Sequence, residues 1–168
     1  MKSNERREEI LKLLINENSA IKGSELAERF SVTRQVIVKD IAILRASGRD
    51  IIATPDGYMY NKSAKRYKAI IAVSHKGNET KDEIETVIKY GGIMEDVIID
   101  HPLYGEIRAS LMIKNLNDLN KFINNFNSKG AKPLSNLTDG VHLHTISAET
   151  EEDINLIKEE LRDKGILL

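Results

Sequence analysis

The chain of 168 residues contains no cysteine and no tryptophan, and aromatic residues make up only 5% of it. Without cysteine it has no disulfide framework, no thiolate nucleophile and no metal site built on thiolates. So few aromatic rings argue against recognition of single-stranded nucleic acid by base stacking. No apolar run reaches the roughly 18 residues of a spanning helix, and the charged N-terminus lacks the apolar segment of a secretory signal. We therefore expect a cytoplasmic protein that has no membrane segment.

What remains is a globular composition, with 40% hydrophobic and 30% charged residues, enough for one domain or two small ones. The net charge of −1 is the sum of two parts of the chain that carry net charges of opposite sign. Residues 1–62 carry 11 Lys and Arg against 9 Asp and Glu, whereas residues 63–168 carry 14 against 17. All four histidines lie in the second part. Because the first part is only mildly basic, any interaction with nucleic acid must be argued from the positions of its charges.

Residues 1–62 are predicted to form a winged helix-turn-helix domain. Apolar periodicity predicts helices over residues 5–17, 25–30 and about 33–46, with Ser24 as the N-cap of the second helix. Two short β-prone runs over residues 51–60 flank a Pro-Asp-Gly turn, which predicts a hairpin directly after the third helix. Two short helices joined by a tight turn and followed by a hairpin are the parts of this DNA-binding fold.

The third helix carries an apolar seam and an opposite polar face. Ile37, Ile41 and Leu44 follow the spacing of one buried helix face, and the pair Ser31-Val32 supplies the tight turn before them. Arginine and glutamine side chains suit the edges of guanine and adenine, and lysine suits phosphates. The residues predicted to contact DNA are Thr33, Arg34, Gln35, Val38, Lys39 and Arg45. The alternative is a three-helix interaction domain whose polar face is merely solvated.

Residues 67–168 are predicted to form a second domain, after a polar link over residues 61–66. The chain alternates in the order β-α-β-β-α-β-α, which predicts an α+β sandwich with helices on one face of a sheet. Strands are expected over residues 67–73, 97–99, 107–113 and 141–146, and helices over residues 79–90, 116–126 and 150–164. Thr150 and Asp153 have the spacing of a capping box at the start of the last helix.

The four histidines of the second domain suggest a metal site. His142 and His144 alternate within a strand, so both imidazoles project from one face. His75 and His101 each stand at the end of a strand, and Glu83 lies near the start of a helix. Imidazole and carboxylate ligands without thiolate suit zinc, nickel, cobalt or iron. The alternative interpretations are a surface histidine pair, a capping box completed by Glu83, and a turn braced by His101.

Two runs of sequence carry a resemblance to a known DNA-binding domain. The run GSELAERFSVTRQVIVKDIAILR at residues 23–45 closely resembles the winged helix-turn-helix of bacterial repressors related to the biotin repressor. The run PDGY at residues 55–58 looks like the tip of their wing. This resemblance is specific for the domain, and it does not identify a ligand.

Three further runs resemble the motifs of the three-histidine (3H) domain: SHKG at residues 74–77, DHPLYG at 100–105 and HLHTI at 142–146. Together with the N-terminal domain, they resemble the niacin-responsive repressor family of NAD biosynthesis and niacin uptake. The resemblance implies one divalent metal per chain, nickel or zinc, and nicotinic acid or a similar small carboxylate as co-repressor. The metal ligands carried over are His75, Glu83, His142 and His144, with His101 as the runner-up.

The expected function is therefore that of a ligand-responsive repressor that binds operator DNA as a homodimer, and not that of an enzyme. His101, Tyr104 and Arg108 are expected to help hold the anionic effector. Two alternatives remain open, a metal-sensing repressor and a metal-dependent hydrolase. A biotin ligase is disfavoured, because there is no glycine-rich phosphate loop after a strand and about 100 residues leave no room for its catalytic domain.

Overall fold

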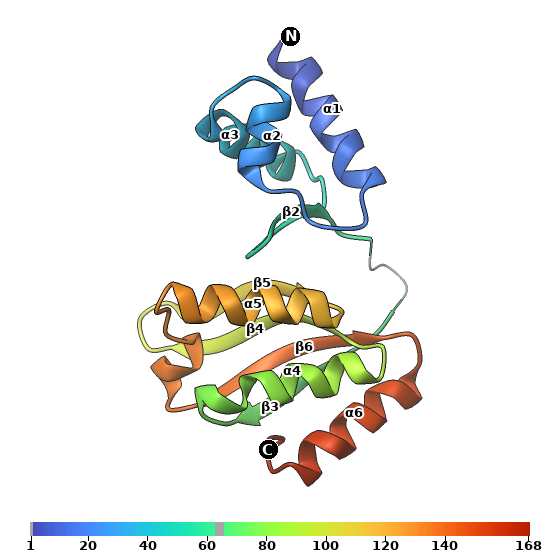
Figure 1. Ribbon diagram of the computed structural model, residues 1–168, viewed down its shortest axis with the longest axis vertical. Coiled ribbons are helices and arrows are strands. Elements are labelled where there is room, and N and C mark those ends of the chain that lie inside the picture. Colours follow the sequence, from blue (N-terminus) through green and yellow to red (C-terminus); the bar gives the residue numbers. More distant parts are fainter. Residues whose placement is uncertain (1, 63–65) are drawn as a thin grey trace. The chain divides into compact units, whose positions relative to one another are not determined.

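The computed structural model describes residues 2–62 and 66–168, and the chain divides into two compact units, Met1–Ala64 and Lys65–Leu168 (Figure 1). The boundary between the units lies inside the predicted link over residues 61–66, whose residues 63–65 are outside the described part of the chain. Within the two described stretches, no helix combines the length and the apolar character needed to cross a bilayer.

The first unit has the predicted helix-turn-helix and hairpin. Its elements are α1 (Ser3–Asn16), α2 (Gly23–Arg29), α3 (Arg34–Ala46), β1 (Ile51–Thr54) and β2 (Gly57–Tyr60). The predicted seam of α3 is buried against side chains of α1 and α2, including Ile10, Leu14 and Leu26. The turn between α2 and α3 is as tight as expected, since Ser31 adopts a φ of 52° and Val32 donates its N–H to the carbonyl of Ala27.

The start of α2 differs from the prediction. The N-cap is Lys22 rather than Ser24, which lies inside the first turn, and the Lys22 side chain makes no capping hydrogen bond. The physical reason is a β-bridge just upstream, in which Ile21 and Tyr58 exchange two backbone hydrogen bonds of 2.8 and 2.9 Å. This bridge fixes the chain before Gly23 and sets where the helix begins, so capping propensity does not decide the boundary.

The same bridge ties the hairpin to the loop between α1 and α2. Gly57 has a φ of +135°, and a Cβ placed there would lie 2.3 Å from the carbonyl oxygen of Ile21. Only glycine fits so close an approach between backbones. The Pro-Asp-Gly signal therefore has two functions, because it turns the hairpin and lets the wing dock against the helices.

The second unit has the predicted order β-α-β-β-α-β-α. Its strands are β3 (Tyr67–Ser74), β4 (Ile93–His101), β5 (Gly105–Ile113) and β6 (Val141–Ala148), and its α-helices are α4 (Thr80–Lys89), α5 (Leu116–Ser128) and α6 (Glu151–Asp163). Short 3₁₀ turns, η1 (Gly77–Glu79) and η2 (Leu134–Thr138), precede α4 and β6. The four strands form one antiparallel sheet in the order β3-β6-β4-β5.

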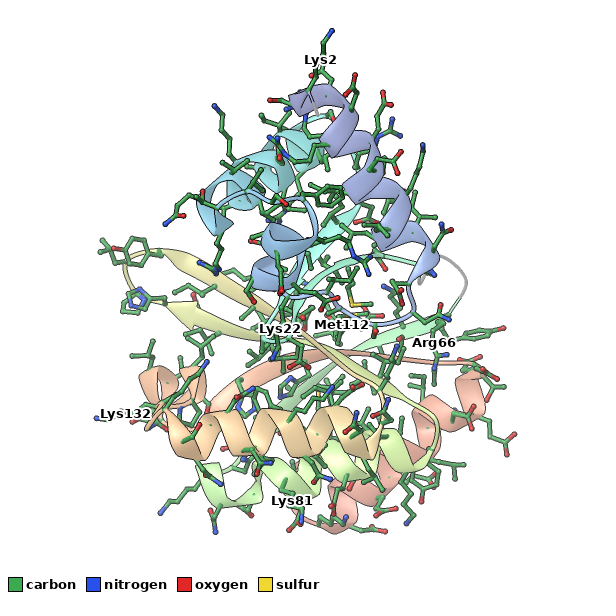
Figure 2. The ribbon with its side chains drawn as sticks, turned by 45° about the horizontal axis from the view of Figure 1, so that its top comes forward. Lys2, Lys22, Arg66, Lys81, Met112 and Lys132 are labelled. Atoms are coloured by element: carbon green, nitrogen blue, oxygen red, sulfur yellow. The ribbon has the colours of Figure 1, made fainter. Side chains whose placement is uncertain are left out.

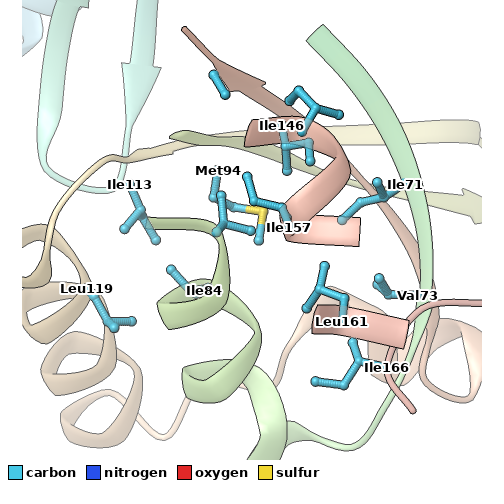
Figure 3. Close-up of a cluster of buried hydrophobic side chains, with 13 residues drawn as sticks. Ile71, Val73, Ile84, Met94, Ile113, Leu119, Ile146, Ile157, Leu161 and Ile166 are labelled. Carbon is cyan, nitrogen blue, oxygen red and sulfur yellow. The ribbon is translucent and has the colours of Figure 1, made fainter. Parts of the chain in front are cut away.

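The three α-helices of this unit cover one face of the sheet, as the sequence predicted. Ile84 of α4, Leu119 of α5 and Ile157 of α6 face the sheet side chains Met94 and Ile146, and all five are at most 1% exposed (Figure 3). At the start of α6, Thr150 is the N-cap and accepts from the backbone N–H of Asp153 at 3.1 Å, which is one half of the predicted capping box. The Asp153 carboxylate accepts from the Thr150 hydroxyl at 2.7 Å, and not from the Thr150 backbone as a capping box requires. This continuous apolar layer fixes the helices rigidly against the strands that carry the histidines.

Strand β4 contains a bulge that changes which of its side chains face the helices. Met94 and Ile98 are four positions apart on β4, whereas their partners on β6, Ile146 and Leu143, are only three positions apart. Met94 packs in the core under the helices, and Val97, three positions later, again faces the helix side, where it lines a cavity. A regular strand would send residues three apart to opposite faces.

Candidate metal centre and candidate DNA-binding helix

Helix α3 exposes the residues predicted to contact DNA. Its N-cap is Thr33, whose hydroxyl accepts from the backbone N–H of Val36 at 3.4 Å. Ile37, Ile41 and Leu44 are buried, so the opposite face is left to solvent. The predicted DNA-contacting residues Thr33, Arg34, Gln35, Val38, Lys39 and Arg45 are all exposed in the free chain. An apolar side chain such as Val38, 42% exposed on this polar face, suits contact with a thymine methyl group.

A buried ion pair that was not predicted fixes α3 against α1. Asp40 is 2% exposed, and its carboxylate accepts from Arg6 at 2.6 Å and from Arg7 at 3.3 Å. Asp40 lies three residues after Ile37, and this spacing places it on the buried seam rather than on the DNA-facing side. The burial of Asp40 could therefore be predicted from the helix period, although its partners Arg6 and Arg7 on α1 could not.

Three histidines and one glutamate meet in the interior of the second unit. His75 follows the end of β3, and Glu83 lies in the first turn of α4. His142 and His144 project from the same face of β6 toward that glutamate. All four side chains are buried. We call this group the His–Glu cluster: His75, Glu83, His142 and His144.

The Glu83 carboxylate is the centre of the cluster. Its Oε2 lies 2.6 Å from His75 Nε2 and 3.9 Å from His142 Nε2, and its Oε1 lies 3.2 Å from His144 Nε2. One ligand atom each from His75, Glu83 and His142 lies within 4.8 Å of the others, an arrangement that could hold a metal ion. His144 approaches the other oxygen of the same carboxylate, which makes it available as a fourth ligand.

Every imidazole of the cluster is oriented by a backbone carbonyl. The Nδ1 atom of His75 lies 2.8 Å from the carbonyl oxygen of Lys76, and that of His142 lies 2.9 Å from the carbonyl oxygen of Gly140. The Nδ1 atom of His144 lies 2.5 Å from the carbonyl oxygen of Asp96. Because a carbonyl oxygen only accepts, each Nδ1 carries a proton, and each Nε2 faces the cluster with a lone pair when the ring is neutral and with a second N–H when the ring is protonated.

This arrangement fits a divalent cation. Neither His144 Nε2 nor Glu83 Oε1 has a hydrogen-bond partner within the described chain, although both atoms are buried. A carboxylate oxygen facing the lone pair of an imidazole nitrogen is unfavourable unless a proton or a cation lies between them. Metal-bound histidines characteristically donate their other ring N–H to a carbonyl or carboxylate, as all three do here.

The charges of the cluster perturb the pKa values of its members. Burial alone would lower the pKa of His75, but the hydrogen bond and negative charge of Glu83 outweigh it, and the pKa is raised above its ordinary value. Burial alone would raise the pKa of Glu83, but His144, His142 and His75 together hold it well below its usual range. Glu83 is therefore an anion that draws positive charge to itself, whether from a proton or from a metal.

An apolar cavity of about 250 Å³ opens beside the cluster. Its floor includes the cluster, its sheet wall includes Val97 and Leu111, and its opposite wall is formed by Phe122 and Phe126 of α5. The segment that connects α5 to β6 also contributes to the lining, with Ala131, Lys132, Pro133, Leu134 and Ser135. None of these residues of α5 and of the connecting segment was singled out from sequence. The available signal was the amphipathic helix over residues 116–126, directly followed by a polar loop that leads into the His-x-His strand.

The structure does not bring the remaining predicted residues into this site. His101 is the last residue of β4, at the turn to β5, and its Nδ1 accepts from the backbone N–H groups of Leu103 and Tyr104. Tyr104 is 73% exposed at the tip of that turn, and Arg108 pairs with Asp96 at 2.8 Å. Neither His101, Tyr104 nor Arg108 lines the cavity. His101 braces the turn, which is the alternative interpretation of this residue, and it is not gathered with the other histidines.

A winged helix with an exposed third helix, joined to a domain that buries a His–Glu cluster, defines a two-domain DNA-binding regulator. Comparison with known proteins agrees, since an HTH domain is matched over residues 6–59 and a 3H domain over residues 68–168. The probable transcription repressor NiaR of Thermotoga maritima is 42% identical over 164 residues, which cover 98% of this chain and 94% of that protein. The transcription repressor NadR of Bacillus subtilis is 39% identical over 167 residues, 97% of this chain and 93% of that protein.

The chain therefore belongs to the family of transcription repressors that join an HTH domain to a 3H domain. Among solved structures, the Thermotoga maritima IclR covers 96% of this chain and 95% of its own at a TM-score of 0.32 and 13% identity, which is too weak a likeness to bear on fold or function.

Proposed function

We propose that this protein represses genes of NAD biosynthesis or niacin uptake in the cytoplasm, with nicotinic acid as co-repressor bound beside a divalent metal. The observation that supports this most is the joining of a buried His–Glu cluster to a small apolar cavity, in a chain whose other unit exposes a recognition helix. The likeness to two transcription repressors named NiaR and NadR supports repression as the output.

The metal proposed is one nickel or zinc ion per chain, held by His75, Glu83, His142 and His144. Imidazole nitrogens suit both ions, and the absence of cysteine from the chain removes the thiolates that many structural zinc sites use. The bound ion would neutralise the buried carboxylate and offer a coordination position to a ligand in the cavity.

The DNA partner proposed is a two-fold operator bound by a homodimer. One winged helix presents a single recognition helix, which reads one half-site, and two-fold operators are read by two-fold proteins. Thr33, Arg34, Gln35, Val38, Lys39 and Arg45 are the proposed contacts. Light scattering of the protein with nicotinate is expected to give the mass of a dimer at micromolar concentration, and a monomer there would contradict this part of the proposal.

The test measures binding of the full chain to a DNA duplex selected from a random pool, by fluorescence anisotropy. Nickel, zinc and nicotinate are added separately and together, after removal of metal with a chelator. We expect full affinity only when metal and nicotinate are both present. Metal alone giving full affinity would instead favour a metal-sensing repressor.

The variant His144→Ala, measured in the same assay, distinguishes the contribution of the second unit to DNA binding from that of the first. It is expected to lose metal retention and the response to nicotinate, because it removes one of the buried nitrogens that face Glu83. Its non-specific affinity for DNA, which depends on phosphate contacts of the first unit, is expected to persist. A metal-free His144→Ala protein that still responds fully to nicotinate would exclude the coupling of metal and effector.

A further inference from the structure

The cavity beside the His–Glu cluster has two apolar walls that belong to different elements. Phe122 and Phe126 lie one helical turn apart on α5, with ring centroids 6.5 Å apart and ring planes inclined by 30°. Val97 of β4 and Leu111 of β5 line the sheet side. Because α5 packs over the sheet, the space between the aromatic pair and the strands is bounded on both sides by apolar groups. Such a space favours a flat apolar body over a branched or highly hydrated one.

The volume of the cavity limits the size of its occupant. About 250 Å³ corresponds to roughly eight water molecules at their share of liquid volume. Drug-sized ligands occupy pockets of about 300–1,000 Å³, so this cavity is suited to a single small ring. A ribose and phosphate attached to that ring would have to lie outside it.

The charged groups of the lining are unevenly placed. Glu83 is the only carboxylate among the lining residues, and it is already surrounded by the three histidines of the cluster. Lys132 is the only lysine or arginine among them. It lies on the segment between α5 and η2, where it is exposed (Figure 2). An exposed ammonium group at an apolar cavity can pair with an anionic ligand without the cost of burying a lone charge.

We propose that Lys132 is the residue that selects a carboxylate, so that the cavity takes a single-ring aromatic monoanion and discriminates against its uncharged amide. The ring lies between the phenylalanine pair of α5 and the strands, with its charged substituent at Lys132 and its other side toward the His–Glu cluster. This inference rests on the proposed function, because it assumes that the ligand site is this cavity. It adds the residue that recognises the carboxylate of the ligand and the size limit that excludes a nucleotide form of it.

The experiment compares four probes, nicotinate, nicotinamide, benzoate and nicotinate mononucleotide, by calorimetric titration of the metal-loaded full chain. The variants are Lys132→Met, which keeps the length of the side chain and removes its charge, and Lys132→Arg, which restores the charge. Lys129→Met is the matched control, because Lys129 is an exposed lysine at the C-terminal end of α5 that does not line the cavity.

We expect the wild-type chain to bind nicotinate well above nicotinamide, and nicotinate mononucleotide far more weakly than nicotinate. In Lys132→Met the affinity for nicotinate falls about tenfold to hundredfold, the range of a hydrogen bond between charged groups, while that for nicotinamide barely changes. Lys132→Arg recovers most of the loss and Lys129→Met shows none. Metal content, measured by mass spectrometry, stays at the wild-type level in all three variants, which shows that the cluster itself is intact.

Equal loss of nicotinate affinity in Lys132→Met and Lys129→Met would overturn the role of Lys132, as would an unchanged preference for nicotinate over nicotinamide in Lys132→Met. Benzoate binding as tightly as nicotinate would still agree with charge selection, since both are single-ring monoanions. Nicotinate mononucleotide binding as well as nicotinate would overturn the size limit. If the wild-type chain binds none of the four probes, the proposed co-repressor itself fails, an outcome distinct from the failure of Lys132 alone.

Discussion

The two units of the chain place their functional side chains in opposite ways. In the first unit every predicted DNA contact is exposed on α3, and the buried polar residue Asp40 serves to hold that helix in place. In the second unit the His–Glu cluster lies in the interior, where each side chain is oriented by a backbone carbonyl or by another member of the cluster. Substitutions of functional residues should therefore reduce DNA affinity without reducing stability in the first unit, whereas in the second unit they should change metal affinity and stability together.

The largest expected effect comes from opening a cavity in either core. Ile37 and Ile157 are both fully buried, one in each unit, and truncating either to alanine should cost its own unit about 2–5 kcal/mol. Ile37→Ala is expected to abolish DNA binding and leave metal binding in place. Ile157→Ala is expected to abolish metal binding and the gain in DNA affinity on adding nicotinate, and to leave the non-specific affinity for DNA in place. Calorimetry should resolve two transitions, of which only one moves in each variant. A single transition that moves in both would show that the units fold as one.

A smaller effect is expected from Gly140, which joins the cluster to the loop before β6. Its carbonyl accepts from His142 Nδ1, and a Cβ at Gly140 would lie 2.8 Å from the carbonyl oxygen of His75. Gly140→Ala should lower metal affinity about tenfold to hundredfold, the usual cost of disturbing a group that orients a ligand. Gly130→Ala is the control, because Gly130 also has a positive φ but has open space around its Cα. Equal metal affinities of the two variants would contradict the role of Gly140.

In the first unit we expect a loss of function without a loss of stability. Arg34→Ala or Gln35→Ala should weaken binding to the selected operator by about 1–3 kcal/mol, the value of one base contact, and leave the melting temperature unchanged. Lys39→Ala should instead reduce the salt dependence of binding by about one charge for all sequences. Lys12→Ala on α1, where the lysine pairs with Glu9, is the control that should do neither. Operator affinity of Arg34→Ala equal to wild type would mean that α3 is not the recognition helix.

The smallest expected effect is a difference in pH dependence between the metal-free units. The raised pKa of His75 stabilises the second unit below the ordinary value of 6.5, and this contribution is lost as the pH rises through the raised pKa. The lowered pKa of Glu83 gives a contribution that is present above 4.5 and lost only as the pH falls through the lowered value. The first 62 residues contain no histidine, so their transition should be flat between about pH 5.5 and 8.

With a chelator present, calorimetry should therefore show the transition of the second unit falling by a few degrees from pH 5.5 to 8 while that of the first stays in place. Added nickel or zinc should reverse this slope, because metal binding requires the histidines to be neutral. A flat second transition without metal would contradict the assignment of His75 as the protonated partner of Glu83.

The same contrast explains how far the sequence could predict each unit. The seam of α3 follows from a period of 3.6 over a dozen residues, so the exposed face of this helix, which we propose contacts DNA, could be predicted without knowledge of any other element. The pairing of His142 with His144 follows equally from the period of a strand. The predicted start of α2 was wrong, because the observed start depends on a bridge between Ile21 and Tyr58, which are 37 positions apart in the sequence.

The surroundings of the cluster could not be predicted from the sequence, because they also depend on contacts between distant segments. The carbonyl of Asp96 meets His144 only because β4 pairs with β6. Phe122 lines the same cavity as the cluster only because α5 packs against the core of this unit. The sequence motif around His101 is as distinct as those of the other histidines. His101 nevertheless ends β4 and contacts the turn that follows, away from the other three histidines. Sequence spacing indicates which residues carry chemistry, and strand pairing decides which of them meet.

The bulge in β4 decides which side chains of this strand line the cavity. After the bulge, Val97 faces the helices and Ile98, paired with Leu143, faces the other way. A regular strand of the same length would turn Val97 away from the cavity and Ile98 toward the helices. Deleting one residue between Met94 and Ile98 would remove the bulge and keep Val97 and Ile98 on the faces that they now occupy, because the spacing would then equal the three positions from Ile146 to Leu143 on β6. Homologous domains can therefore lose one residue here and still line the cavity with the same side chains.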